Sequence, residues 1–168
     1  MLKETFESND VEFLDSGIRY RNIQAEHIVF AEGFGLHKNP FFNYLPLDGT
    51  KGELFIIKAP NLNLDVIVNT SVFILPLGNG LFKVGATYNW HDKTAEPTEE
   101  GKKELLQRIK EIITCDFEIV KHFGGVRPTV ADRRPIIGTH EAHKSLHVLN
   151  GLGTRGVMLG PSLARILF

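Results

Sequence analysis

The chain has 168 residues, of which 42% are hydrophobic and 23% are charged, and its formal net charge is −1. This length suits one domain with a sizeable core, and the balanced charge gives no electrostatic basis for binding nucleic acid or an anionic membrane surface. The single cysteine, Cys115, excludes an internal disulfide and fits a reducing cytoplasm, where we expect the protein. No apolar run approaches the length of about eighteen residues that a membrane span requires, so we expect no such span.

The first part of the chain is expected to form short strands joined by turns. Val11–Leu14 and Ile18–Ile23 have strand composition and are separated by turn formers. The apolar run His27–Gly33 ends in glycine, which is typical of a strand buried on both faces. A loop rich in turn formers is expected over Pro40–Gly52, and a further strand over Glu53–Ala59.

The middle of the chain predicts a hairpin followed by a helix. Val66–Leu75 and Leu81–Tyr88 are rich in strand formers and flank a Gly-Asn-Gly turn. Thr98 is then placed to cap a helix with acidic residues in its first turn. The apolar residues of this helix recur at helical spacing, so one helix face should lie on a sheet. They are Leu105, Leu106, Ile109, Ile112 and Ile113.

The remaining elements complete the prediction of the fold class. Strands are predicted over Phe117–Phe123 and Leu146–Asn150, and a C-terminal helix is predicted over Val157–Leu167. The whole pattern predicts an α+β fold, with a mostly antiparallel sheet, one long amphipathic helix and a C-terminal helix.

The densest set of motifs lies near the C-terminus. Arg127 follows two glycines and precedes Pro128, and a tight corner with Asp132 comes next. The glycine-spaced loop Asn150–Gly156 then opens directly into the final helix. Glycines before a helix let the backbone approach a ligand, while unpaired N–H groups and the positive end of the helix dipole face it. This arrangement predicts a cradle for an anionic or carbonyl-rich cofactor.

These motifs resemble the C-terminal part of FAD-dependent oxidoreductases of the D-amino-acid oxidase and glycine oxidase family. The resemblance implies FAD as cofactor and hydride transfer from an amino acid or secondary amine to the flavin. It also implies a partial flavin-binding domain over residues 1–50, a partial substrate domain over 51–123 and a C-terminal flavin-binding segment over 124–168. The residues that carry it are Gly125, Arg127, Pro128, Asp132, Pro135, Gly138, Gly151, Gly153, Gly156 and Pro161.

One part of the family pattern is not found in this sequence. Such flavoproteins begin with a strand, a G-x-G-x-x-G turn and a helix that hold the pyrophosphate. Gly151, Gly153 and Gly156 have this spacing, but no βαβ unit follows them. We therefore expect the chain to be the C-terminal half of a longer protein and to be inactive alone.

The resemblance implies roles for individual residues, each with a structural alternative. Arg127 would hold the substrate carboxylate, and its alternative is a structural pair with an acid such as Asp132. Phe73 and Tyr88 would line the substrate pocket, and their alternative is core packing. Glycine oxidases carry tyrosine where Phe73 stands, which favours a bulkier or more apolar amine than glycine.

The residues expected to bind the cofactor come from three segments. The alternative for Gly33 is a core strand followed by a turn, and the alternative for the C-terminal loop is an ordinary glycine-capped turn. The full set is Gly33, Gly125, Val126, Asn150, Gly151, Gly153, Thr154, Arg155, Gly156, Val157 and Met158.

The expected partners are a small-molecule amino acid or amine, and either a second copy of the chain or the missing N-terminal half. No metal site is expected, because the spacing of His140, Glu141 and His143 differs from the H-E-x-x-H spacing of zinc enzymes. The alternative to an enzyme is a non-catalytic module that associates with itself or another chain and binds no cofactor.

Overall fold

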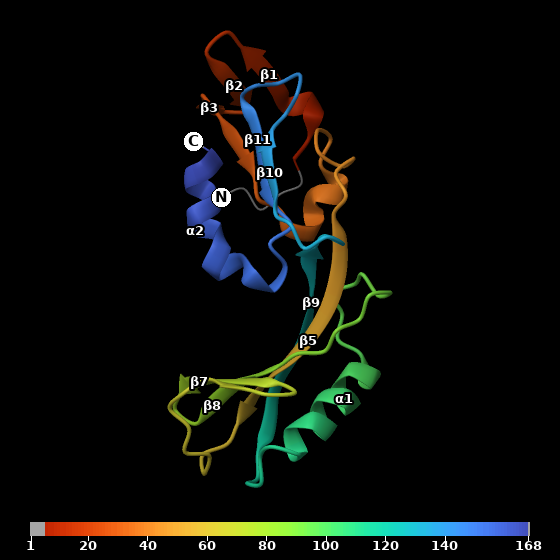
Figure 1. Cartoon of the computed structure of the whole chain (residues 1–168), viewed down its shortest axis with the longest axis vertical. Coiled ribbons are helices and arrows are strands. Elements are labelled where there is room, and N and C mark those ends of the chain that lie inside the picture. The colour runs from red at the N-terminus through yellow and green to blue at the C-terminus, as the bar shows by residue number, and fades with distance from the viewer. Residues whose placement is uncertain (1–5, 168) are drawn as a thin grey trace. The chain divides into compact units, whose positions relative to one another are not determined.

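A computed structural model describes residues 6–167 as two compact units (Figure 1). The first unit combines the described residues up to Gly49 with those from Arg127 onward, and the second spans Thr50–Val126. The strands are predominantly antiparallel and the chain ends in a helix, which confirms the predicted α+β class.

The first unit contains two three-stranded sheets. Strands β1 to β3 form an antiparallel meander, and the other sheet has the order β10-β11-β4, with β10 and β11 antiparallel but β11 and β4 parallel. The strands are β1 (Val11–Leu14), β2 (Gly17–Tyr20), β3 (Ile23–Ala25), β4 (Ile28–Phe30), β10 (Ile136–Thr139) and β11 (Leu146–Asn150). Three short 3-10 helices, η1 (Ser8–Asp10), η2 (Gly33–Lys38) and η3 (Gly153–Arg155), and the helix α2 (Gly156–Leu167) complete the unit.

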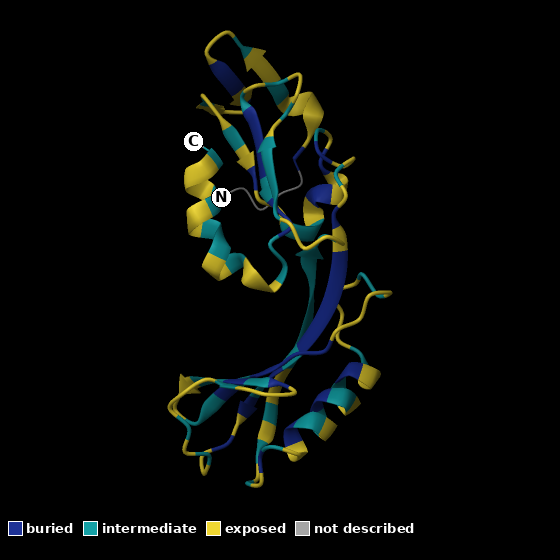
Figure 2. Ribbon diagram, in the orientation of Figure 1, coloured by how far each residue is buried: buried dark blue, intermediate teal, exposed yellow. Residues whose placement is uncertain are grey.

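Aromatic side chains dominate the core of the first unit. Phe6 stacks on Tyr20 with ring centroids 4.2 Å apart and meets Phe30 edge-on at 4.9 Å. Helix α2 contributes no buried residue to this core, and Figure 2 shows it in the colours of intermediate and exposed residues. The core consists of Phe6, Ile18, Tyr20, Phe30, Leu36, Phe42, Leu47, Leu146 and Val148.

The second unit is a five-stranded sheet with one long helix. The sheet has the order β6-β7-β8-β5-β9. Its elements are β5 (Asp48–Lys58), β6 (Val68–Asn69), β7 (Phe73–Gly78), β8 (Leu81–Gly85), α1 (Glu99–Lys110) and β9 (Glu118–Thr129). The predicted hairpin turn is confirmed, because Asn79 and Gly80 both have positive φ angles, 53° and 70°, as a tight two-residue turn requires.

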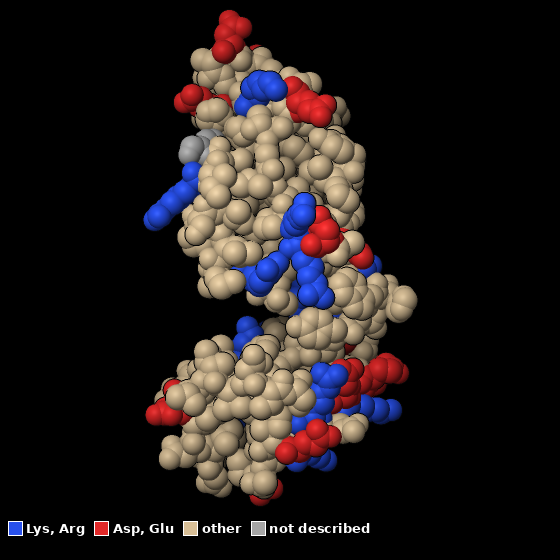
Figure 3. Space-filling model, in the orientation of Figure 1, with Lys and Arg blue, Asp and Glu red and all other residues tan. Residues whose placement is uncertain are grey.

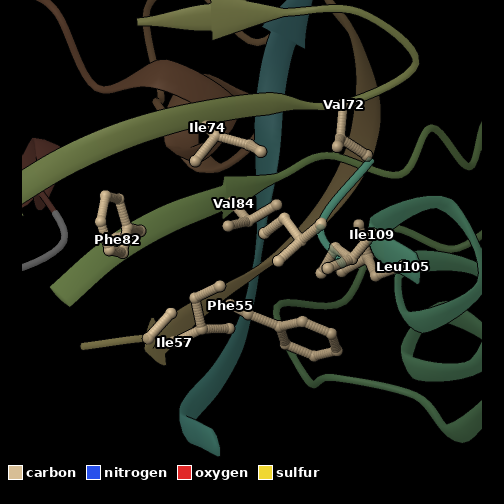
Figure 4. Close-up of a cluster of buried hydrophobic side chains, with 10 residues drawn as sticks. Phe55, Ile57, Val72, Ile74, Phe82, Val84, Leu105 and Ile109 are labelled. Carbon is tan, nitrogen blue, oxygen red and sulfur yellow. The ribbon is translucent and has the colours of Figure 1, made fainter. Parts of the chain in front are cut away.

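The core of the second unit lies between the sheet and α1. Figure 4 shows Leu105 and Ile109 of α1 directed toward Phe55, Val84 and their neighbours on the strands. Both helix residues are 0% exposed, so each stabilises the fold by about 1.5–3 kcal/mol. The predicted cap is also confirmed, since the Thr98 hydroxyl accepts a hydrogen bond from the Gly101 amide at 3.0 Å.

Two predictions about strands near the N-terminus are wrong. The run His27–Gly33 forms a strand only over Ile28–Phe30, and it is not buried on both faces, because Val29 is 38% exposed. Among residues 6–167, this strand pairs only with β11, which leaves its other edge uncovered. Strand β5 begins at Asp48 within the predicted loop, and the polar residues at its start are buried by the hydrogen bonds described below.

The hairpin strands are shorter than predicted. The run Val66–Leu75 is broken between β6 and β7 by a turn in which the Thr70 amide donates to the Val72 carbonyl at 2.9 Å. Strand β8 ends at Gly85, before the predicted end at Tyr88. Beyond it, the Thr87 amide donates to the Glu53 carbonyl at 3.2 Å, but the Glu53 amide donates to the Thr87 hydroxyl at 2.9 Å, so a side chain takes the place of one backbone acceptor.

Candidate functional site

Three strand ends converge in the first unit. Gly33 follows β4, Pro128 stands near the end of β9, and Gly153 follows β11. A methyl group added to Gly33 would lie 3.9 Å from Pro128 Cγ, and one added to Gly153 would lie 4.0 Å from the Pro128 carbonyl oxygen. Segments far apart in the sequence are therefore brought together here.

Asn150 holds two of these strand ends together. Asn150 is only 3% exposed, and its side-chain Nδ2 donates to the Gly33 carbonyl at 2.9 Å. Its Oδ1 accepts from the Gly151 amide at 2.8 Å. Because both ends of the side-chain amide are used, Asn150 fixes the end of β4 against the start of the glycine loop.

The glycine loop needs its glycines for conformation and for space. Gly151 and Gly153 have φ angles of 69° and 55°, in the left-handed region that L side chains rarely adopt. A methyl group at Gly151 would also lie 2.6 Å from Val130 Cγ2. The tight loop leads through η3 directly into α2, so the N-terminal end of this helix, at Gly156, Val157 and Met158, follows the glycine loop without an intervening residue.

The start of α2 combines amide donors with uncovered apolar surface. Val157 is 98% exposed and Met158 67% exposed. Thr154 is exposed as well, whereas the Arg155 guanidinium donates to the Arg133 carbonyl at 2.7 Å and so secures the preceding corner. N–H groups beside apolar side chains fit a cofactor with a polar edge and a planar apolar ring.

Arg127 lies on β9 directly before Pro128 and is half-buried. The corner that follows is ordered by its own residues, because Asp132 Oδ1 accepts from the Arg134 amide at 2.9 Å and the Arg133 amide donates to the Val130 carbonyl at 2.9 Å. A planar guanidinium at the end of the strand is the residue type that binds a carboxylate through two parallel hydrogen bonds.

The other predicted site residues belong to the second unit. Phe73, on β7, is half-buried and pairs in register with Gly85 on β8. Its ring lies over that glycine, since a methyl group there would come within 3.2 Å of Phe73 Cε1. Tyr88 is 59% exposed, just beyond β8.

The two glycines before Arg127 differ in their surroundings. A methyl group at Gly125 would meet no atom within 4 Å, whereas one at Gly124 would lie 2.9 Å from the Ala95 carbonyl oxygen. Gly125 and Val126 are both half-buried on β9. Gly124 therefore serves the packing of the second unit, and Gly125 leaves open space beside the strand.

The sequence did not reveal a buried charge network in the second unit. Lys51, whose side chain is 1% exposed, donates to Asp92 Oδ2 at 2.5 Å, to Thr94 Oγ1 at 3.2 Å and to the Glu96 carbonyl. Hydrogen bonds from Lys51 and then from Thr94 lower the pKa of Asp92 to about 2, so this carboxyl stays ionised. The lysine thereby fixes the segment between β8 and α1.

Glu53 continues the network toward α1. Its side chain is 4% exposed and accepts from the Thr98 hydroxyl at 2.7 Å and the Thr98 amide at 3.0 Å. It also bonds His122 Nε2 at 2.8 Å and lies 3.7 Å from Lys51 Nζ. In the sequence, Lys51 and Glu53 stand just before the apolar run Leu54–Ile57, and their partners are distant along the chain, so no local pattern indicated them.

Histidines form two pairs in the first unit. His147 Nε2 lies 2.9 Å from His27 Nδ1, and the rings of His140 and His143 stack 4.9 Å apart. Burial, followed by the neighbouring histidine, lowers the pKa of both His140 and His147. In the part of the chain that the structure describes, no group of three or more His, Cys, Asp or Glu residues is arranged to hold a metal ion.

Surface features add little to this site. On the face drawn in Figure 3, basic and acidic side chains are intermixed over the region of α1. None of the helices within residues 6–167 has both the length and the apolar character needed to cross a membrane.

A parallel strand pair, a glycine loop and a following helix are typical of proteins that bind nucleotide cofactors. The chain belongs to the FAD dependent oxidoreductase family, whose sequence profile matches residues 4–168. This finding confirms the resemblance seen in the sequence, and the expected cofactor, FAD, is the one that defines the family.

Curated relatives and solved structures agree with this family. The chain is 29% identical over 164 residues to the tRNA 5-methylaminomethyl-2-thiouridine biosynthesis bifunctional protein MnmC of Marinobacter nauticus, covering 88% of this chain and 26% of that protein. It is 26% identical over 151 residues to glycine oxidase of Bacillus licheniformis, covering 86% of this chain and 40% of that enzyme. The chain thus spans well under half of these relatives.

The fold is shared with solved oxidases. The glycine oxidase structure from Geobacillus kaustophilus superposes with a TM-score of 0.78 at 24% identity, covering 98% of this chain and 47% of that one. The iminodiacetate oxidase structure from Chelativorans sp. BNC1 gives a TM-score of 0.73 at 24% identity, covering 94% of this chain and 47% of that one.

Proposed function

We propose that this chain forms the substrate-side half of an FAD-dependent oxidoreductase that oxidises the C–N bond of an amino acid or secondary amine. The observation that carries the proposal is the position of Asn150, which joins Gly33 to Gly151 immediately before the start of α2. This junction presents a glycine loop and a helix N-terminus, as an anionic or carbonyl-rich group requires. Family membership supplies the redox chemistry.

The residues present fit the flavin at this junction. The amides of Gly156, Val157 and Met158 would donate to the polar edge of the ring, and the exposed Val157 and Met158 side chains offer apolar surface beside them. Bound FAD would accept a hydride from the substrate carbon. Gly33, Gly125, Val126, Asn150, Gly151, Gly153, Thr154 and Arg155 complete the proposed cofactor set, with Asn150 and Arg155 acting through the loops that they secure.

Arg127, Phe73 and Tyr88 are the proposed substrate residues. Arg127 would bind the substrate carboxylate bidentately and so position the carbon that loses the hydride. Phe73 presents an apolar ring without a hydroxyl, which favours a bulkier or more apolar amine than glycine. Tyr88 is exposed just beyond β8 and would line the substrate pocket together with Phe73.

We also propose that the two units have different functions. The first unit would contribute to the flavin site, and the second, Thr50–Val126, would be the substrate domain. Because the chain spans 26–47% of the relatives and structures named above, an N-terminal half would supply the pyrophosphate-binding turn, and the chain alone would be inactive. We place the whole enzyme in the cytoplasm.

The test uses the flavin-loaded protein that carries this chain. Arg127→Ala should lower kcat/KM for the amino acid by about a hundredfold or more, equivalent to about 2–4 kcal/mol, because a charge-assisted bidentate pair is lost. Arg127→Lys should recover only part, since an ammonium lacks the planar fork. The matched control is Arg134→Ala, because that side chain is 86% exposed and should leave kcat/KM unchanged.

A second substrate identifies the role of Arg127. The amine that lacks the carboxylate should be oxidised equally by the wild type and by Arg127→Ala. Equal loss of both activities with flavin still bound would contradict carboxylate binding. If the wild type binds no flavin, the alternative function, a non-catalytic association module, is favoured by the uncovered apolar side chains Val157, Met158 and Ile166.

A further inference from the structure

The sheet of the second unit has a face that α1 does not cover. Successive side chains of a strand point to opposite faces, and Phe55, Ile57, Ile74, Phe82 and Val84 all point into the core beneath α1 (Figure 4). Their neighbours in sequence therefore form the other side, which we call the far sheet face. Its residues are Leu54, Ile56 and Lys58 of β5, Phe73 and Leu75 of β7, and Leu81, Lys83 and Gly85 of β8.

Lys83 is the charged residue at the centre of the far sheet face. It is half-buried, and its register partners are Ile56 on one side and Leu75 on the other, both apolar. Its stem therefore lies between hydrocarbon side chains. A charge in such surroundings is less screened than one in open water, so it attracts an opposite charge more strongly.

A second ammonium lies near the same place. Lys83 Nζ lies 6.0 Å and Lys121 Nζ 5.5 Å from the centre of the Phe123 ring, so both ammonium groups lie close to the same aromatic side chain. Within the described residues 6–167, neither lysine has a carboxylate at ion-pair distance. The sheet thus holds two cations together without an internal anion to neutralise them.

The cations lie next to a proposed substrate residue. Phe73 pairs with Gly85, and Leu75 pairs with Lys83, so the aromatic ring and the lysine share one face two residues apart along adjacent strands. Two residues of a strand span about 7 Å, which is the scale of a small diacid. A ligand that contacts Phe73 would therefore reach Lys83 with an anionic group a few bonds away.

We propose that the far sheet face binds a second anionic group of the substrate, with Lys83 as its main ligand and Lys121 beside it. The substrate would then be an amine that carries two carboxylates. This inference rests on the proposed amine oxidation and narrows its substrate class.

The first experiment measures binding without turnover. Glutarate and pentanoate, which have the same carbon number but differ by one carboxylate, are titrated calorimetrically into the protein that carries this chain, at constant ionic strength. Lys83→Gln should weaken glutarate binding by about tenfold or more, and Lys83→Arg should retain most of it, because a charge-assisted hydrogen bond is lost only in the first variant. The control is Lys103→Gln on α1, an exposed lysine that should leave both affinities unchanged.

The second experiment measures specificity in the flavin-loaded protein. Iminodiacetate and N-methylglycine share the secondary amine and one carboxylate, and only the former has the second. Lys83→Gln should lower the ratio of kcat/KM for iminodiacetate to that for N-methylglycine by about tenfold, Lys121→Gln should lower it less, and Lys103→Gln should not change it.

The outcomes separate this inference from the proposed function. If Lys83→Gln reduces both substrates equally, or if glutarate binds wild type and Lys83→Gln alike, the second-anion site is refuted while amine oxidation stands. If neither amine is oxidised by the wild type but glutarate binding depends on Lys83, the anion site stands and the proposed reaction is wrong.

Discussion

Removal of the Lys51 ammonium tests whether the buried charge network stabilises the second unit. In Lys51→Met the stem is kept, but the bonds to Asp92, Thr94 and the Glu96 carbonyl are lost. Breaking a buried ion pair by removing one partner costs about 3–5 kcal/mol. We expect the lower end, about 3 kcal/mol, because Asp92 is 27% exposed and can be rehydrated, whereas only Glu53 remains buried beside the gap.

The assay uses the only tryptophan of the chain. Trp90 lies two residues before Asp92, so its fluorescence reports the segment that Lys51 holds. In urea, a loss of about 3 kcal/mol corresponds to a midpoint lower by about 1–3 M. Lys58→Met is the matched control, because Lys58 is an exposed residue of the same strand and its replacement should change stability by no more than about 0.5 kcal/mol.

The refuting result is simple to recognise. If Lys51→Met and Lys58→Met shift the urea midpoint equally, the buried lysine contributes no more than a surface charge. The inferred role of the network in fixing the segment before α1 would then be wrong.

Two further predictions concern stability. Gly101→Ala should destabilise the second unit by about 1–3 kcal/mol, although Gly→Ala usually stabilises a helix, because the methyl group would overlap the buried Glu53 carboxylate. In α2, a methyl group at Gly160 would lie 4.0 Å from its nearest neighbour, Leu152 Cδ1, so Gly160→Ala should stabilise by up to about 1 kcal/mol. Lowering the pH below 6.5 should decrease the free energy of unfolding. The folded-state pKa values of His140 and His147 are lowered, so the unfolded chain binds protons at a higher pH than the folded chain does. Above pH 6.5 these histidines are neutral in both states and do not reduce the stability.

Each of these predictions has a direct check. Urea unfolding at fixed pH decides the glycine pair, and a gain in stability for Gly101→Ala would contradict the crowding around Glu53. Urea unfolding of the wild type above and below pH 6.5 tests the histidines, with His91→Asn as a control at an exposed position in the second unit. A double replacement of His140 and His147 by phenylalanine should flatten the pH dependence, and an unchanged slope would contradict their role.

Periodic and local patterns made much of the fold predictable from the sequence. The Thr98 cap, the helical spacing of Leu105 and Ile109, and the Asn79-Gly80 turn depend on neighbours within a few residues. The same holds for β11, whose predicted bounds Leu146–Asn150 agree with the structure. Such features are decided by backbone and side-chain chemistry that lies within one element.

Predictions failed where distant partners determine the outcome. Strand β5 extends back to Asp48 because Lys51 and Glu53 find partners at Asp92 and His122, which lie 41 and 69 residues further along the chain. The exposure of Val29 depends on what packs against its face of β4, which composition does not reveal. The residue roles proposed for Arg127 and the glycine loop stay predictions, since they were inferred from motif spacing.

Asn150 and Lys51 have the same physical role in the two units. Each is a buried polar side chain whose hydrogen bonds order a segment of irregular backbone, and each segment carries or adjoins proposed site residues. An unsatisfied buried amide or ammonium is costly, so neither segment can move without losing these bonds. The glycine loop and the segment after β8 are therefore held rigid by one side chain each, and this rigidity is what positioning a cofactor or substrate requires.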